Sequence, residues 1–369
     1  MFTTLVFFII LGVLVIVHEF GHFIAAKNSG VRVERFFIGF GKKLFSVKKN
    51  GTEYGLSALP LGGYVKLAGD NYDEYKGAPD EYLAQPIRKR FWIIFCGPLL
   101  NYALGFISFW IIFCVGYPTI TNKVGGVLDG YGAQAAGITA GDRITSIEGV
   151  SVKTWDDIQK TIYANRQKAE LKVEILRKDK QETLSVGLKQ SSQTDTLGQK
   201  RSLGLIGIKP DMEETIIERY GFFESAYYGF KKTIDMTAMT YRALWLMMTR
   251  QLSVRESVTG PVGMFIITSE VTKMGIIALM HWVALLSVSL ALFNLLPFPA
   301  LDGGHIALLF LEKIRGRGLS RRSDDVFNRI GFGFIILVAA AVFFNDVIRY
   351  ELPGKFVQVL DKATHFIKK

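Results

Sequence analysis

Long runs of apolar residues alternate along this chain with segments that carry most of its charge. An apolar run of about 20 residues is long enough to cross a lipid bilayer as a helix. Four apolar runs predict transmembrane helices over 1–26, 91–117, 276–311 and 330–349, and the third reaches a sufficient length by Leu296 before it continues. Inside the third run Pro297 and Pro299 must interrupt the helix, because proline lacks the backbone N–H that a helix interior needs.

The first apolar run could instead be a secretory signal peptide. A signal peptide begins with a basic region and ends on small residues at a cleavage site. This run has no Lys or Arg before its apolar part, and His18, Glu19 and His22 lie where a cleavage site would be. We therefore interpret the run as the first transmembrane helix.

The segments between the apolar runs differ in character. Short β-rich stretches over 27–90 predict a loop of β-hairpins. Alternating strands and one amphipathic helix predict an inserted α+β domain over 118–210. Over 211–275 aromatic residues are interleaved with charges, which is typical of helices that lie in a membrane interface. A short C-terminal tail follows at 350–369.

Composition and charge indicate a membrane protein and not a nucleic-acid-binding one. The 369 residues are 49% hydrophobic, with a mean hydropathy of +0.25 and a formal net charge of +11. The basic residues gather in short loops beside the apolar runs, where they set membrane orientation. The basic loops between the first and second runs and between the third and fourth runs are predicted to be cytoplasmic. The inserted domain is then predicted to lie outside. Cys96 and Cys114 lie about five helical turns apart in one run, so they cannot form a disulfide.

The end of the first apolar run contains candidate chemistry. His18, Glu19 and His22 form the pattern His-Glu-x-x-His. Positions i and i+4 lie on one face of a helix, so both imidazoles can bind one metal ion, and the glutamate can deprotonate a water on it. The pattern also occurs by chance, but three ionisable residues inside an apolar run are costly without partners. We therefore predict a metal site with Glu19 as general base.

The third ligand must come from another membrane-embedded segment, because a catalytic zinc ion normally takes three protein ligands. Asp302 is the candidate, since it follows the proline-interrupted stretch, and irregular backbone at membrane depth can line a cavity. The alternative is that Asp302 caps the helix beginning at Gly303. His305 could also bind a metal, but with three ligands already present a supporting or structural role is the simpler interpretation.

Asn294 precedes the proline-interrupted stretch, and two roles are open for it. Its amide can donate a hydrogen bond to the scissile carbonyl or to the developing oxyanion of a hydrolysis reaction. It can equally tie two membrane helices together. Both roles are kept as hypotheses.

Three stretches of the chain carry a resemblance to a known family. They are His18 to His22, Asn294 to His305 with its asparagine, double proline and Leu-Asp-Gly, and Gly97-Pro98-Leu99-Leu100-Asn101. The chain resembles the site-2 protease family of intramembrane zinc metalloproteases (peptidase family M50), of the bacterial regulator of sigma-E protease type. The resemblance covers essentially the whole length. It implies a polytopic α-helical membrane protein with Zn²⁺ as cofactor and Asp302 in the third-ligand position.

The resemblance also implies how substrate is held. It identifies a membrane-associated β-loop that pairs with an unwound substrate segment through Gly62, Gly63, Tyr64, Val65, Lys66 and Leu67. Strand addition agrees with protease physics, because a helix must be extended before its peptide bonds can be reached. Residues 134–144 resemble bacterial PDZ domains, and 201–210 resemble the strand beside their peptide groove. That groove either binds a peptide or acts as a steric filter.

The implied activity is cleavage of single-span membrane proteins within or beside their transmembrane helix. By resemblance, the substrates would be anti-sigma factors already trimmed by another protease, and remnant signal peptides. The protein would lie in the bacterial inner membrane, with a periplasmic PDZ domain and an active site open to the cytoplasm. Relatives often carry two PDZ domains, and one is evident here.

Two other classes of function compete with the protease. A non-catalytic scaffold would bind partners through the PDZ domain and hold a structural zinc ion. Such a site needs no glutamate beside a ligand and would close its fourth position with protein. A metal transporter would need further intramembrane carboxylates and histidines along a path, and the first, second and fourth runs are otherwise apolar. The protease is the preferred hypothesis.

Overall fold

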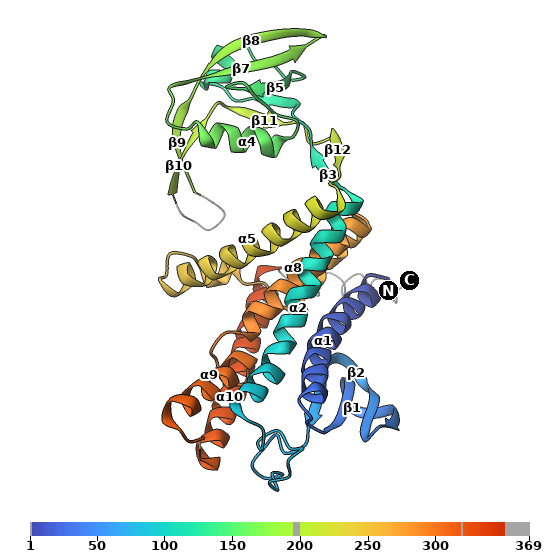
Figure 1. The fold of residues 1–369 in the computed structure, drawn as a ribbon. Helices are drawn as coiled ribbons and strands as arrows, with labels where there is room; N and C mark the ends of the chain where they lie inside the picture. The colour runs from blue at the N-terminus through green and yellow to red at the C-terminus, as the bar shows by residue number, and fades with distance from the viewer. Residues whose placement is uncertain (1, 195–199, 319, 351–369) are drawn as a thin grey trace, which may run out of the picture. The chain divides into compact units, whose positions relative to one another are not determined.

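The computed structural model describes residues 2–194, 200–318 and 320–350 (Figure 1). Apart from residue 350, the predicted C-terminal tail lies outside the described residues. The chain forms two compact units. The first unit comprises Met1–Ile111, Tyr227–Tyr241 and Ser253–Lys369, and the second comprises Ile112–Ala226 and Arg242–Leu252.

Four helices are long and apolar enough to cross a membrane. They are α1 (Phe2–Asn28), α2 (Ile87–Val115), α8 (Ile276–Asn294) and α10 (Arg321–Arg349). Only 11% to 33% of their most apolar windows is buried within the protein, so most of this apolar surface is available to lipid. Helices that are apolar on all sides are typical of membrane spans. The chain is therefore a multi-pass membrane protein with four candidate spans, as the apolar runs predict.

Two of these helices differ in extent from the predicted runs. The third run, expected to continue to residue 311, divides into α8 and α9 (Asp302–Arg315), with the two prolines in the turn between them. Helix α10 begins at Arg321 instead of near residue 330, because Ser320 caps its N-terminus by accepting a hydrogen bond from the Ser323 N–H.

Three helices lie between the second and third spans. They are α5 (Phe222–Met248), α6 (Val254–Ser257) and α7 (Pro261–Lys273). Helix α5 exposes large apolar side chains at helical spacing along its length, among them Phe223, Tyr227, Phe230, Trp245 and Met248. An exposed apolar stripe on a helix with charged neighbours is typical of an interfacial helix.

A buried acid joins α10 to α7. Asp346 in α10 is fully buried, and its two oxygens accept hydrogen bonds from the backbone N–H groups of Gly260 (3.0 Å) and Gly263 (2.8 Å). These N–H groups lie at the start of α7, where a negative charge is stabilised by the helix dipole. The carboxylate thus satisfies helix donors that have no partner within the helix itself.

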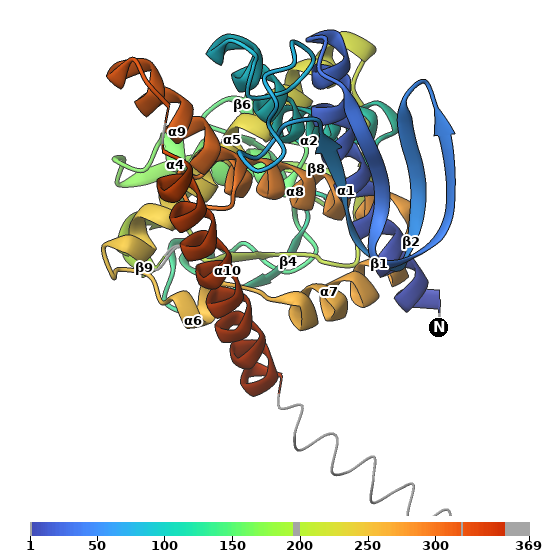
Figure 2. The same ribbon diagram turned by 90° about the horizontal axis from the view of Figure 1, so that it is seen from below.

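The segment between the first two spans folds into a bent hairpin of two long strands, β1 (Val33–Lys49) and β2 (Thr52–Leu67). The first half of β1 pairs with residues 63–67 on one side and with 53–56 on the other. The last part of β2 is therefore an edge strand, and no other described strand pairs with its outer side. Figure 2 shows the hairpin running beside α1.

Apolar side chains fix the base of this hairpin against two helices. They form a buried cluster of Ala25 and Ala26 from α1, Val31, Val33 and Leu67 from the hairpin, and Ile93 from α2. Burying such side chains stabilises the packing by about 25 cal/mol per Å² of apolar surface. The cluster holds the edge strand close to the C-terminal half of α1.

The second unit is an inserted domain of short strands and two helices. Its strands are β3 (Tyr117–Ile120), β4 (Val124–Val127), β5 (Arg143–Ile147), β6 (Val150–Ser151), β7 (Glu170–Arg177), β8 (Lys180–Gly187), β9 (Lys189–Thr194), β10 (Lys200–Leu205), β11 (Ile208–Pro210) and β12 (Thr215–Glu218). Its helices are α3 (Gly132–Ala135) and α4 (Trp155–Ala164). Strands β6, β5, β7 and β8 form an antiparallel sheet, and the other strands pair as β4 with β11, β3 with β12 and β9 with β10.

The core of the inserted domain explains these elements. Alternate residues of β7 are buried, while α4 turns Ile158 and Ile162 inward and begins with a capping box between Thr154 and Asp157. Strand alternation and helical spacing thus point apolar side chains into one core.

Asp142 ties the start of β5 to the end of β7. It is only 2% exposed and accepts hydrogen bonds from the Arg177 guanidinium (2.6 and 2.8 Å) and the Thr139 N–H (2.8 Å). Burial alone would raise the pKa of Asp142, but these bonds outweigh burial and hold its pKa below the usual value. Such a carboxyl stabilises the fold above its unfolded pKa of about 3.9, and the effect is lost as pH falls through the folded pKa.

We expect Asp142→Ala to lower the free energy of unfolding of the inserted domain by about 1–3 kcal/mol at pH 7, because buried donors lose their acceptor. The loss should shrink at pH 3. Hydrogen exchange of the β5 and β7 amides in the solubilised protein, corrected for intrinsic rates, measures the loss of unfolding free energy at each of the two pH values. An equal loss at the two pH values would show that the charge of Asp142 is not what stabilises the domain.

Candidate metal centre

Helix α1 places two imidazoles side by side within the first apolar span. His18 and His22 are four residues apart, so they lie on one face of the helix. Their side chains are 12% and 14% exposed, and their Nε2 atoms are 3.2 Å apart. Two ring nitrogens that converge at this distance, in largely apolar surroundings, can share a cation.

Asp302 reaches the same point from α9. It is the first residue of that helix, and the N-cap position belongs to Leu301. Oδ2 of Asp302 is buried and accepts no hydrogen bond from any described residue, so the alternative of a helix-capping aspartate has no support here. The carboxylate faces the two histidines instead.

A tight turn between α8 and α9 aims this carboxylate. A Cβ atom on Gly303 would overlap with the backbone carbonyl of Leu295, and one on Gly304 would overlap with that of Phe298. Ala300 has a φ of 67°, in the left-handed region that is strained for residues with a side chain. The two glycines therefore let the turn fold back onto the first turn of α9.

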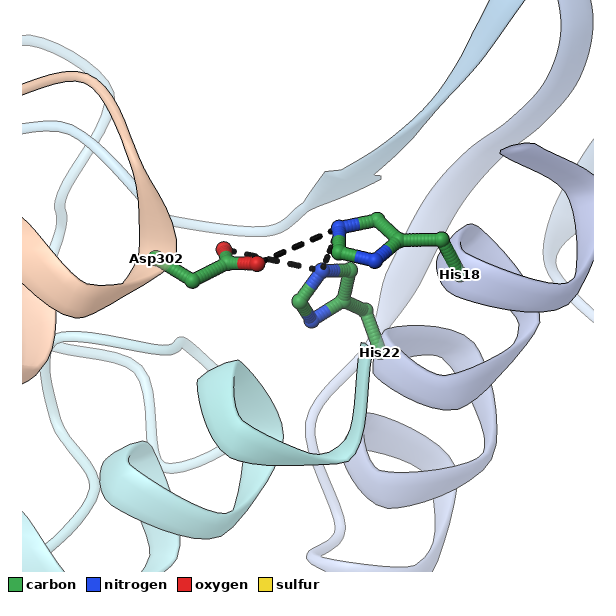
Figure 3. A group of neighbouring side chains, drawn as sticks. All are labelled: His18, His22 and Asp302. Atoms are coloured by element: carbon green, nitrogen blue, oxygen red, sulfur yellow. Dashed lines mark hydrogen bonds and ion pairs between the residues drawn. The ribbon is translucent and has the colours of Figure 1, made fainter. Parts of the chain in front are cut away.

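The three side chains have the spacing of a metal site (Figure 3). His18 Nε2 is 3.1 Å from Asp302 Oδ2, and His22 Nε2 is 3.7 Å from Asp302 Oδ1. Ligands about 2.0–2.1 Å from a tetrahedral zinc ion lie about 3.3 Å from one another. One ligand atom from each residue lies within 4.8 Å of the others. The donor set of two imidazoles and one carboxylate, with a buried oxygen that lacks a hydrogen bond, fits a catalytic zinc ion.

Helix α2 packs against the histidines. The Nδ1 atom of His22 lies 2.8 Å from the backbone carbonyl of Ile93, which leaves Nε2 to face the cluster. A Cβ on Gly97 would overlap with that Nε2, and a Cβ on Gly21 would overlap with the carbonyl of Cys96. Small residues thus allow α1 and α2 to approach closely at the site.

Glu19 lies between this cluster and the edge strand of the hairpin. Its carboxylate is close enough to interact electrostatically with His22 and Asp302, and it reaches the backbone of Val65. A Cβ built on Gly63 would be 3.5 Å from Glu19 Cγ. The glutamate is therefore next to both the candidate metal ligands and the strand predicted to hold substrate.

The structure brings some predicted residues together and leaves others apart. Asn294 ends α8, before the turn, and no described contact joins it to the three candidate ligands. His305 lies one turn after Asp302 but contacts Phe327, and it lines a separate polar cavity with Arg90 and Tyr82. His305 is therefore not part of the cluster, in keeping with the supporting or structural role preferred for it from the sequence.

Sequence reasoning missed the roles of α2. Ile93 contributes only a backbone carbonyl, which leaves no signal in residue type. Gly97 lies within the stretch Gly97 to Asn101 noted for its family resemblance, but its contact with His22 depends on helix packing.

The chain is similar to known proteins over most of its length. The model of peptidase family M50 matches residues 6–338. A protein of Clostridium acetobutylicum named as a zinc metalloprotease is 33% identical over 91% of this chain and 95% of its own length. The regulator of sigma-W protease RasP of Bacillus subtilis is 28% identical over 95% of this chain and 99% of its own length.

Part of the chain is also similar to solved structures. The PDZ domain of an SdrC-like protein from Listeria monocytogenes is 26% identical, covers 26% of this chain and 92% of its own, and has a TM-score of 0.21. The corresponding domain from Listeria innocua is 27% identical, covers 26% and 97%, and has a TM-score of 0.20.

We expect Gly97→Ala to reduce zinc binding strongly, because the new methyl group displaces the His22 ring from the cluster. Gly12→Ala in α1 is the matched control, since outside the neighbouring backbone of α1 no atom of the described residues lies within 4 Å of its added Cβ. Zinc content of the purified variants, measured by mass spectrometry of the metal, checks this. If Gly97→Ala retains full zinc content, His22 does not hold the ion in this position.

Proposed function

The chain belongs to peptidase family M50, and on that premise we propose that it is an intramembrane zinc endopeptidase that cleaves single-span membrane proteins within or beside their transmembrane segment. The observation that carries the proposal is the convergence of His18 and His22, from the apolar span α1, with Asp302 at the start of α9, and Glu19 lies beside them. A structural metal site has no need of this adjacent carboxylate.

In this proposal His18, His22 and Asp302 hold the zinc ion. Relatives named as zinc metalloproteases support the identity of the metal, as does the donor set. When bound, zinc supplies Lewis acidity that polarises the scissile carbonyl and makes water a better nucleophile.

Glu19 performs the proton transfers. Its carboxylate takes a proton from the attacking water and returns it to the leaving amine of the cleaved peptide bond. The apolar helices around it exclude bulk water, which strengthens the electrostatic interactions of these groups. Asn294 is proposed to donate its amide to the scissile carbonyl or to the developing oxyanion, and its alternative role remains that of tying helices together.

The edge strand of β2 is proposed to hold the substrate. Residues Gly62 to Leu67 form the outer strand of the hairpin, and an extended peptide can add to such an edge through backbone hydrogen bonds. Tyr64 stacks on Phe37 and Phe40, with ring centroids 5.6 and 6.3 Å apart, which stiffens this edge. Because Glu19 lies beside Gly63, a peptide paired here is next to the general base.

The inserted domain is proposed to be a PDZ domain that faces the periplasm. The basic loops of the first unit favour cytoplasmic placement of the hairpin and of the entrance to the active site. A groove of about 560 Å³ lies between α4 and residues 204–210, where a PDZ domain binds peptides, and it serves either to bind a terminus or to filter substrates by size. A bacterial inner membrane location is part of this proposal, and the bacterial relatives that the chain matches support it.

Anti-sigma factors are the proposed class of substrate, with remnant signal peptides as a second class. The relative named as a regulator of sigma-W protease supports the first class, because its name links proteolysis to a sigma factor. In both cases the substrate is a single membrane helix that must be unwound before hydrolysis.

Glu19→Gln should retain zinc and lower the cleavage rate of a model single-span substrate at least 10²–10⁴-fold, because the amide keeps the shape of the side chain and removes the base. Cleavage in liposomes and zinc content are measured on the same preparations. Equal cleavage by variant and wild type would contradict the mechanism. Zinc binding without cleavage by either, across several substrates, would favour the non-catalytic scaffold.

Strand addition predicts a position-specific cross-link. With Cys96 and Cys114 changed to Ser and Glu19 to Gln, Tyr64→Cys should form a disulfide with a cysteine placed in the cleaved segment of the substrate. Leu44→Cys, on the opposite edge of the hairpin and 62% exposed, is the control. Non-reducing gel electrophoresis detects the product, and equal yields from both positions would refute pairing at the β2 edge.

A further inference from the structure

One face of α2 lies against both candidate histidine ligands. Ile93, Gly97 and Asn101 are spaced by four residues, so they form a stripe along this helix. The backbone carbonyl of Ile93 accepts a hydrogen bond from the His22 ring, and Gly97 leaves room for that ring. Asn101 lies at the next position of the stripe, where it meets His18.

Asn101 approaches the side of the His18 ring that faces away from the cluster. Its Nδ2 atom is 3.5 Å from Nδ1 of His18, while Nε2 of His18 faces Asp302 and His22. Asn101 is fully buried, and its Oδ1 atom has no hydrogen-bond partner among the described residues. A buried amide oxygen without a donor costs about 1–3 kcal/mol, so this side chain requires an explanation.

The chemistry of a histidine ligand supplies one. An imidazole that offers the lone pair of Nε2 to a metal carries its proton on Nδ1, and that N–H needs an acceptor. Rotation of the Asn101 amide by about 180° about its Cβ–Cγ bond exchanges the positions of Nδ2 and Oδ1. Oδ1 then accepts a hydrogen bond from the Nδ1–H group of His18, and Nδ2 moves to the position that Oδ1 had occupied.

Neighbouring contacts hold the backbone of Asn101 in place. The hydroxyl of Ser287, a fully buried residue of α8, donates to the carbonyl oxygen of Asn101 at 2.7 Å. A Cβ on Gly105, one turn further along α2, would overlap with Val288 of α8, so the two helices pack closely there. The position of the amide is thus set by three membrane helices.

We propose that Asn101 is a positioning residue that fixes the tautomer and the ring orientation of His18, so that Nε2 is presented to the zinc ion. The role is equivalent to that of the Ile93 carbonyl at His22, and it rests on the proposed zinc site. An amide suits a membrane interior because it accepts the proton without adding a charge that would need its own partner.

The proposal predicts an order of zinc affinities that a packing role would reverse. Asn101→Leu keeps the volume and removes the acceptor, so zinc affinity should fall about 10–100-fold. Asn101→Asp keeps an acceptor at the same place, so its affinity should be close to that of the wild type. If Asn101 only filled space, leucine would be tolerated better than a buried carboxylate.

The test is zinc binding by the full-length solubilised protein, in competition with a chromophoric chelator. Cleavage of the model substrate by Asn101→Leu should also recover at saturating zinc, which loss of the fold would prevent. Wild-type affinity in Asn101→Leu, weaker binding by Asn101→Asp than by Asn101→Leu, or no recovery of cleavage would overturn the proposal. Absence of zinc binding by the wild type would overturn the zinc site itself, together with this inference.

Discussion

Ionisable side chains inside apolar helices must find partners, and the architecture of the first unit follows from this constraint. Two imidazoles of α1 and a carboxylate of α9 would each be costly in hydrocarbon if left alone. They converge instead on one point, with separations of 3.1 to 3.7 Å between their ligand atoms. The same principle explains Asp346, whose carboxylate binds the first N–H groups of α7. These ionisable groups are thus paired with one another or with a helix end.

Close backbone approach makes that convergence possible. Gly21 and Gly97 allow α1 and α2 to touch at the histidines, and Gly303 and Gly304 allow the preceding turn to fold against α9. A side chain at any of these positions would overlap with backbone or with a ligand. The apolar cluster at the base of the hairpin then holds the edge strand beside Glu19. The base, the candidate ligands and the substrate strand therefore depend on the same few helix contacts.

Local patterns in the sequence predict much of this arrangement. The apolar runs predict the four candidate spans because membrane insertion depends on the length and apolarity of a segment. His18 and His22 follow from the helical period alone, and Asp302 follows from the need for a third ligand near broken backbone. Helix ends are predicted less well: α10 begins near Ser320, because a capping serine and charged residues extend a helix beyond its apolar part.

What the sequence did not predict depends on tertiary packing. The short β-rich stretches form two long strands, and the first half of β1 pairs with β2 on both of its sides. This pairing joins residues that are distant in the sequence. The contact between Asn101 and His18 joins residues 83 positions apart, and no local spacing encodes it. The carbonyl of Ile93 is available on any residue type, so only the fold assigns it to His22. These supporting contacts require the three-dimensional arrangement of α1, α2 and α8.

The central claim is that two imidazoles and one carboxylate hold a single zinc ion between α1 and α9. X-ray absorption spectroscopy at the zinc edge, on the full-length solubilised protein with one equivalent of zinc, measures the ligand set directly. The account predicts scattering from two imidazole rings and two further oxygen ligands at about 2.0–2.1 Å, one of them from Asp302. A sulfur ligand at about 2.3 Å, or scattering from a single imidazole, would contradict it.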